Sequence, residues 1–308
     1  MRCDLIDAAD ERPVALDGGL ATQLEAQGND LSSQLWSARL LVDDPEQIVE
    51  AHRRFFAAGA RVAITATYQA SFDGLARHGH DHADAARLMR LSVALARRAA
   101  EEAPGDDRRW VAASVGPLGA ARADGSEYHG DYGLTVEDLR AWHRPRLHAL
   151  ADAGADLLAV ETVPCLAEAE ALAIELDGLG MPAWLSLTCA DGRTRAGERV
   201  ADAFAMAAAV DEIVAVGVNC TEANEVASLV ETAVSMSGKP AVAYPNSGEG
   251  WDARRRAWTG HGTFTSSAVA TWVAGGARLV GGCCRVTPDQ IAAVAAVLAD
   301  ASPADPVG

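Results

Sequence analysis

Three cysteines lie in two short motifs whose residue types suit a soft metal ion. Cys283 and Cys284 are adjacent and follow two glycines, and Cys220 ends the apolar segment 217–220. Three thiolate ligands suit Zn(II), and a fourth position left to water or substrate is typical of a catalytic site. We therefore predict one Zn(II) per chain, bound by Cys220, Cys283 and Cys284.

The adjacent cysteines also have interpretations that need no metal. Free cysteine is commonly buried as a small apolar residue, and a vicinal pair can form a redox-active disulfide. A thiol redox protein that used Cys283 and Cys284 would form this disulfide without any contribution from Cys220.

Two carboxylates follow apolar segments and form a second candidate group. Asp17 precedes two glycines, and Glu161 lies between Val160 and Thr162. Burial of a carboxylate is costly unless it meets a cation or several hydrogen-bond donors. Asp17 and Glu161 can therefore hold the ammonium group of a substrate, or each can accept hydrogen bonds from amides of its own loop.

The elements that must position these residues follow a repeating pattern. Eight short apolar runs, rich in Val, Ile, Leu and Ala, alternate with longer segments of helical period, which is typical of β/α units around a parallel sheet. The runs expected to be strands are 14–17, 62–68, 110–115, 156–162, 183–189, 213–220, 241–246 and 278–284. The segments expected to be helices include 45–58, 82–102, 136–153, 167–179, 200–210, 222–235, 266–274 and 287–298.

Eight strands and eight following helices are the number in a closed (β/α)8 barrel of the TIM type. We predict an α/β fold with this barrel as a single domain over residues 1–308. The chemistry of such barrels lies at the carboxyl ends of the strands. Strands six and eight are next-but-one neighbours at that rim, so Cys220 can meet Cys283 and Cys284 there. Other polar side chains at strand ends are Thr65, Tyr68, Ser114, Thr188, Asn219 and Asn246.

The composition excludes some classes of partner. The net charge of −17 argues against a nucleic acid or an anionic membrane surface, because both require clustered Lys and Arg. No stretch approaches the roughly 18 consecutive apolar residues of a membrane span, and segment 1–13 lacks an apolar signal core. We expect a cytoplasmic protein with reduced cysteines. Cys3 is expected in a mobile terminus, and Cys165 and Cys189 are expected to pack in the core or to support neighbouring ligands.

Longer motifs connect the two candidate groups. They are Leu16-Asp17-Gly18-Gly19, Thr65-Ala66-Thr67-Tyr68-Gln69-Ala70, Glu127-Tyr128-His129-Gly130-Asp131-Tyr132, Gly217-Val218-Asn219-Cys220 and Gly281-Gly282-Cys283-Cys284-Arg285. With these motifs the chain resembles the homocysteine S-methyltransferases over almost its whole length. The resemblance implies that the three cysteines bind zinc and that Asp17 and Glu161 contact the amino group of homocysteine. It also places Trp36 at a donor-facing position with Tyr68 nearby, although aromatic residues in barrel loops are as often packing residues.

Within this family, segments 68–70, 125–132 and 244–249 look like the branch that uses S-methylmethionine. The resemblance therefore implies zinc-dependent methyl transfer from this small sulfonium donor to the thiol of homocysteine, giving methionine. S-adenosylmethionine and betaine are the alternative donors. A barrel that only stores zinc is a non-enzymatic alternative, in which the two carboxylates would have no role. The candidate substrate-binding residues are Asp17, Trp36, Thr65, Tyr68, Glu161, Asn219 and Asn246.

Overall fold

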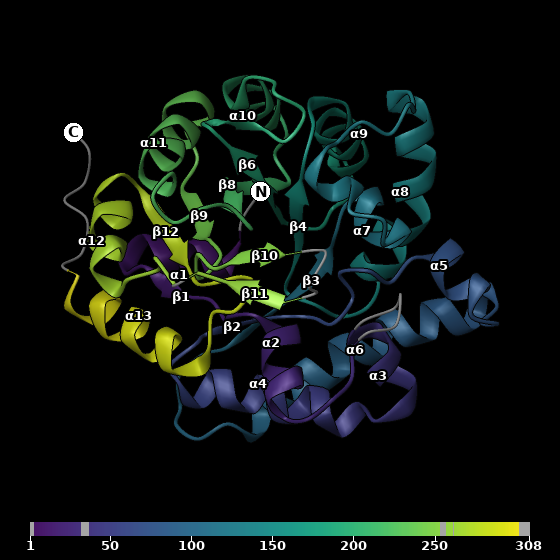
Figure 1. Cartoon of the computed structure of the whole chain (residues 1–308), viewed down its shortest axis with the longest axis horizontal. Helices are drawn as coiled ribbons and strands as arrows, with labels where there is room; N and C mark the ends of the chain where they lie inside the picture. The colour runs from purple at the N-terminus through teal and green to yellow at the C-terminus, as the bar shows by residue number, and fades with distance from the viewer. Residues whose placement is uncertain (1–2, 32–36, 253–256, 261, 302–308) are drawn as a thin grey trace.

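The computed structural model describes residues 3–31, 37–252, 257–260 and 262–301. In this part of the chain, eight parallel strands form one sheet in the order β1-β12-β9-β8-β5-β4-β3-β2. A bridge between Leu16 and Val62 joins the two edges, so the sheet closes into a barrel surrounded by helices (Figure 1). The predicted (β/α)8 barrel is confirmed. Its strands are β1 (Val14–Ala15), β2 (Val62–Ile64), β3 (Trp110–Val115), β4 (Leu157–Val163), β5 (Ala183–Leu187), β8 (Ile213–Asn219), β9 (Ala241–Tyr244) and β12 (Ala277–Val280).

The helices comprise one that precedes β1 and others that follow the strands around the outside of this barrel (Figure 1). They are α1 (Asp4–Glu11), α2 (Leu20–Ala26), α3 (Ser37–Asp43), α4 (Pro45–Ala57), α5 (Phe72–Arg77), α6 (His82–Glu102), α7 (Leu118–Arg122), α8 (Val136–Ala151), α9 (Leu166–Leu176), α10 (Val200–Ala208), α11 (Val226–Ser237), α12 (Ser266–Ala274) and α13 (Pro288–Asp300), with a 3-10 turn η1 (Ser126–Tyr128). Two short hairpins also lie in rim loops: β6 (Cys189–Ala190) with β7 (Arg193–Thr194), and β10 (Gly250–Asp252) with β11 (Ala257–Thr259). None of the helices described is long and apolar enough to cross a lipid bilayer.

Several helices begin where the sequence supplies a cap. Thr135 and Asp138 form a capping box at the start of α8, and Thr287 forms one with Gln290 at α13. Pro45 is the first residue of α4, where its missing N–H costs no hydrogen bond of the helix. These caps fix the starting points of the helices that pack around the sheet.

Helix α1, which the sequence pattern did not predict, closes the amino-terminal end of the barrel. Leu5 and Ala9 pack with the side chains of the barrel interior, and the indole N–H of Trp110, at the start of β3, donates to Asp4 at 3.2 Å. The expectation of a mobile terminus around Cys3 is wrong, because Cys3 is buried in the same interior cluster. The apolar face of this short helix covers the interior side chains at that end and shields them from water.

The last barrel strand is shorter than predicted and ends at Val280. A Cβ atom at Gly281 would lie 2.6 Å from the carbonyl oxygen of Asp17, so only glycine allows the two loops to approach so closely. The chain leaves the sheet at this point. Cys283 and Cys284 therefore lie in the loop after β12 instead of at the end of the strand. Strands β1 and β2 are also shorter than predicted and end at Ala15 and Ile64.

Candidate functional site

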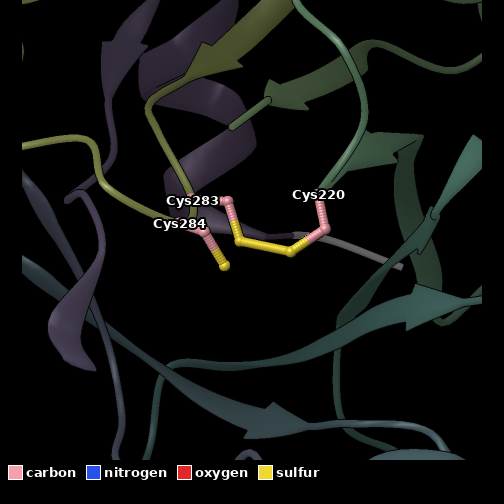
Figure 2. A group of neighbouring side chains, drawn as sticks. All are labelled: Cys220, Cys283 and Cys284. Carbon is pink, nitrogen blue, oxygen red and sulfur yellow. A yellow bond between two sulfur atoms is a disulfide. The ribbon is translucent and has the colours of Figure 1, made fainter. Parts of the chain in front are cut away.

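The three predicted ligands meet at the carboxyl end of the barrel. Cys220 directly follows β8, and Cys283 and Cys284 follow β12, with β9 between these two strands. Their Sγ atoms all lie within 4.8 Å of one another. Figure 2 shows Cys220 facing the cysteine pair, with its sulfur joined to that of Cys283 in a disulfide. Cys284 is a free thiol beside this bond.

The disulfide differs from the vicinal pairing of the metal-free redox interpretation. It joins Cys283 to Cys220, from another strand, and leaves Cys284 unbonded. A redox function that is independent of Cys220 does not match this connectivity. The three sulfurs, once reduced, form the soft donor set that Zn(II) accepts, and three protein ligands leave one position for a substrate atom. The donor chemistry of the site therefore fits zinc.

Two asparagines hold the backbone and side chains of the cysteine loops. The Asn246 Oδ1 atom accepts a hydrogen bond from the backbone N–H of Cys284 at 3.2 Å. The Asn219 side chain, which is fully buried, accepts from the backbone N–H of Thr162 and donates to its hydroxyl, both at 2.7 Å, and its Nδ2 atom lies 3.9 Å from the Cys283 sulfur. Both residues were predicted as substrate contacts, and the structure places them against the candidate metal ligands Cys283 and Cys284.

Asp17 and Glu161 are both buried, Asp17 after β1 and Glu161 in β4, with β2 and β3 between these two strands in the closed barrel. The Asp17 Oδ2 atom accepts from the backbone N–H of Ile64 at 2.8 Å, whereas Oδ1 is buried and accepts no hydrogen bond from any described residue. Burial raises the pKa of Asp17 well above its usual value, and the charge of Glu161 raises it further. A buried acceptor without a donor fits a missing cationic group such as an ammonium.

The Glu161 carboxylate is partly satisfied by hydroxyl groups. The Ser114 hydroxyl donates to its Oε1 atom at 2.5 Å. Burial raises the pKa of Glu161 to about 7, although hydrogen bonds from Ser114 and Tyr244 and the charge of Arg146 oppose this rise. The charge of Glu161 also raises the pKa of the buried Asp17 and of the half-buried Cys284, which places both carboxylates and the Cys284 thiol in one electrostatic environment.

The residues after β2 form the side of the site between these groups. Thr65 is buried, and its hydroxyl lies 2.8 Å from that of Thr67 and accepts from the backbone N–H of Ser114 at 3.0 Å. Burial raises the pKa of the Tyr68 phenol, and the neighbouring Tyr128 and Glu161 act in the same direction. Thr65 thus supports the loop, and Tyr68 lies within electrostatic reach of Glu161. Trp36 lies outside the described residues.

Two arginines that the sequence reasoning missed contact the same loops. The Arg146 guanidinium is buried and donates to the carbonyl oxygens of Thr67 at 2.7 Å, Tyr68 at 2.8 Å and Gly116 at 2.8 Å. Arg195 donates to the carbonyl oxygen of Cys220 at 3.2 Å. Arg146 could have been found, because it interrupts the buried apolar stripe of α8. Nothing in the sequence near Arg195 indicates its contact with Cys220.

Comparison with known proteins agrees with this geometry. The family model for homocysteine S-methyltransferase matches residues 14–298. A homocysteine S-methyltransferase of Escherichia coli (strain K12) is 46% identical over 290 residues, covering 91% of this chain and 94% of the relative. The homocysteine S-methyltransferase YbgG of Bacillus subtilis (strain 168) is 42% identical over 294 residues, covering 92% and 93%.

Solved structures give the same result. The metallated form of the homocysteine methyltransferase MmuM from Escherichia coli has a TM-score of 0.84 at 43% identity, covering 95% of this chain and 98% of that chain. Its oxidized form has the same TM-score and identity, and covers 95% and 97%. The chain belongs to the homocysteine S-methyltransferase family, which is a family of methyltransferases.

Proposed function

We propose that this protein transfers a methyl group from S-methylmethionine to the thiol of homocysteine, with one Zn(II) held by Cys220, Cys283 and Cys284. The observation that carries the proposal is the convergence of three cysteine sulfurs within 4.8 Å at the carboxyl end of the barrel. Catalytic sites of (β/α)8 barrels lie at this end. The names of the relatives from Escherichia coli and Bacillus subtilis support homocysteine as the methyl acceptor.

The acceptor needs activation because a free thiol has a pKa of about 8.5 and the thiolate is the nucleophile. Bound zinc would supply this activation by favouring the thiolate form of the substrate at neutral pH. The cysteine loops would hold the ion, with Asn219 and Asn246 keeping Cys283 and Cys284 in place.

The two buried carboxylates would bind the amino group of homocysteine. An ammonium beside Asp17 and Glu161 favours their ionised forms and thus lowers both raised pKa values. The Oδ1 atom of Asp17, which has no donor from the described residues, would accept from this ammonium. Binding of the amino group and of the sulfur at two separate points orients homocysteine for attack.

In the transfer step, the homocysteine sulfur attacks the methyl carbon of the sulfonium donor from the side opposite the leaving sulfur. The new S–C bond forms as the old one breaks, and the donor leaves as a neutral thioether, so that S-methylmethionine and homocysteine give two methionines. Attack requires the reacting atoms about 3 to 3.5 Å apart in line. An onium group also favours an aromatic face, which Tyr68 offers at the rim and for which Trp36 is a further candidate.

The proposed compartment is the cytoplasm, where the thiols stay reduced.

Donor competition tests the choice of donor. Reduced, zinc-loaded protein is supplied with homocysteine and equal concentrations of S-methylmethionine, S-adenosylmethionine and betaine, each carrying a differently labelled methyl group. We expect the label in methionine to come mainly from S-methylmethionine. Label that comes mainly from either other donor would overturn the donor assignment, and no labelled methionine from any donor would overturn the proposed reaction.

A further inference from the structure

The Cys220 backbone adopts a conformation that a residue with a Cβ atom seldom takes. Its φ angle is +49°, in the left-handed region. This turn brings the residue out of β8 and directs its sulfur towards the two cysteines after β12 (Figure 2). A strained conformation persists only when surrounding contacts hold it. The contacts that hold Cys220 therefore decide where this sulfur lies.

Two donors meet at the carbonyl oxygen of Cys220. The Thr188 hydroxyl, directly after β5, donates at 3.1 Å, and Nη2 of Arg195 donates at 3.2 Å. The two donors are also linked to each other, because Nε of Arg195 donates to the Thr188 hydroxyl oxygen at 3.2 Å. Thr188 is fully buried. The peptide after Cys220 is thus fixed by a closed set of three hydrogen bonds.

Arg195 also contacts an aromatic ring. Its guanidinium carbon lies 5.6 Å from the ring centroid of Tyr128, which belongs to the turn η1. Within the part of the chain that the structure describes, Arg195 forms no ion pair with a carboxylate. Its charge is directed at a carbonyl oxygen and an aromatic face. A planar, multidentate group suits this arrangement, which a lysine ammonium cannot reproduce.

We infer that Arg195 is a positioning residue that holds Cys220 in the orientation required of a metal ligand and so raises the affinity of the site for zinc. The inference rests on the proposed function, because it presumes that the three cysteines bind zinc. It adds a residue from the hairpin β6–β7 region, which belongs to neither cysteine motif, and it assigns that residue a role in metal binding instead of substrate contact.

The test is the zinc affinity of reduced protein, measured by competition with a chromophoric chelator in the absence of substrates. We expect Arg195→Met to weaken zinc binding by about tenfold, as is typical when a group that orients a metal ligand is removed. Arg195→Lys should recover only part of this loss. The matched control is Arg199→Gln on the same loop, because the Arg199 side chain is 71% exposed. This variant should bind zinc as tightly as the original protein does.

A second variant covers the case in which Arg195→Met does not fold. Thr188→Val keeps the shape of the side chain but removes the hydroxyl that links Arg195 to Cys220, and it should also weaken zinc binding. The losses of the two single variants should add to more than the loss of the double variant, because both act on one carbonyl group. Folding is checked by circular dichroism and thermal unfolding.

The outcomes separate this inference from the proposed function. Tight zinc binding by the original protein with unchanged affinity in folded Arg195→Met and Thr188→Val would overturn the role of Arg195 alone. A loss of methyl transfer in Arg195→Met at unchanged zinc affinity would likewise overturn it, since Arg195 would then act on a substrate. Absence of zinc binding in the reduced original protein would overturn both the inference and the proposed function.

Discussion

The Asp17 Oδ2 atom lies 4.0 Å from Nδ1 of His52, and neither ring nitrogen of this buried imidazole has a hydrogen-bond partner in the described part of the chain. Burial lowers the pKa of His52 to about 4. The imidazole is therefore neutral at physiological pH and does not form an ion pair with the carboxylate. The Asp17 carboxylate therefore remains available to a substrate cation, because it is not paired with a protonated His52.

The first prediction concerns acid stability. Because the native state resists protonation of His52 and the unfolded state protonates near pH 6.5, stability is lost as the pH falls from 6.5 to 4, by up to about 3 kcal/mol. In His52→Leu the free energy of unfolding should fall less between pH 6.5 and 4 than in the original protein. His148→Gln, on the exposed side of α8, should show the same fall as the original protein. Urea unfolding at pH 7 and pH 4.5 measures the difference. Equal pH dependence in the original protein and in His52→Leu would contradict the assignment.

The second prediction concerns Glu161. Its pKa rises from 4.5 to about 7 in the folded protein, so its contribution is present below pH 4.5 and is lost as the pH rises through 7. At pH 8 the substrate-free protein therefore carries an unfavourable buried charge. Glu161→Gln should raise the free energy of unfolding at pH 8 by about 1 kcal/mol or more. The same variant should raise the KM for homocysteine by about tenfold or more, because a charged hydrogen-bond partner of the ammonium is lost.

Chemical unfolding and initial-rate kinetics on the same preparations check this trade-off. Glu170→Gln, exposed on α9, serves as the control and should change neither quantity. A Glu161→Gln variant that is less stable at pH 8 and binds homocysteine normally would show that this carboxylate has a structural role only.

The third prediction concerns the buried guanidinium of Arg146. Arg146→Met leaves three carbonyl oxygens of two site loops without their donor, and each unsatisfied buried group costs about 1–3 kcal/mol. We expect a loss of about 3 kcal/mol or more in the free energy of unfolding. Arg144 lies on α8 as Arg146 does, but it forms a partly exposed ion pair with Glu175 of α9. Arg144→Met removes this pair and should cost about 1 kcal/mol or less. Similar losses in both variants would refute the difference we draw between them.

The fourth prediction concerns oxidation of the site. The Cys220–Cys283 disulfide occupies two of the three proposed zinc ligands. Protein isolated under oxidising conditions should therefore contain little zinc, and reduction with added zinc should restore about one ion per chain. Elemental analysis before and after reduction measures the change. Full zinc content in protein whose disulfide is intact by mass spectrometry would be incompatible with this ligand set.

The sequence pattern was sufficient for the barrel and for the convergence of the three cysteines, because each depends on local periodicity or on motif spacing along predicted strands. It placed Cys220 and the pair Cys283 and Cys284 at the correct rim, since the spatial order of barrel strands follows their order in the chain. The prediction failed for Cys3, because α1 is stabilised by its packing against the amino-terminal end of the barrel. The local sequence of this helix carries no strong helical pattern.

Long-range side-chain contacts were also beyond the sequence. Asn246 was predicted as a substrate contact from its position at a strand end, and the sequence did not indicate that its Oδ1 atom also accepts a hydrogen bond from the backbone N–H of Cys284. Arg195 reaches the carbonyl oxygen of Cys220 from another β/α unit. Such contacts depend on rotamers and loop paths that residue spacing does not specify.

The measurement that tests the central claim most directly is the zinc content of reduced protein together with methionine formation from homocysteine and S-methylmethionine. It compares the original chain with Cys283→Ser and with Cys165→Ser, a buried cysteine outside the cluster. We predict about one zinc per chain and methionine formation in the original protein and in Cys165→Ser, and the loss of both in Cys283→Ser. Methionine formation by zinc-free protein, or undiminished activity in Cys283→Ser, would contradict the account.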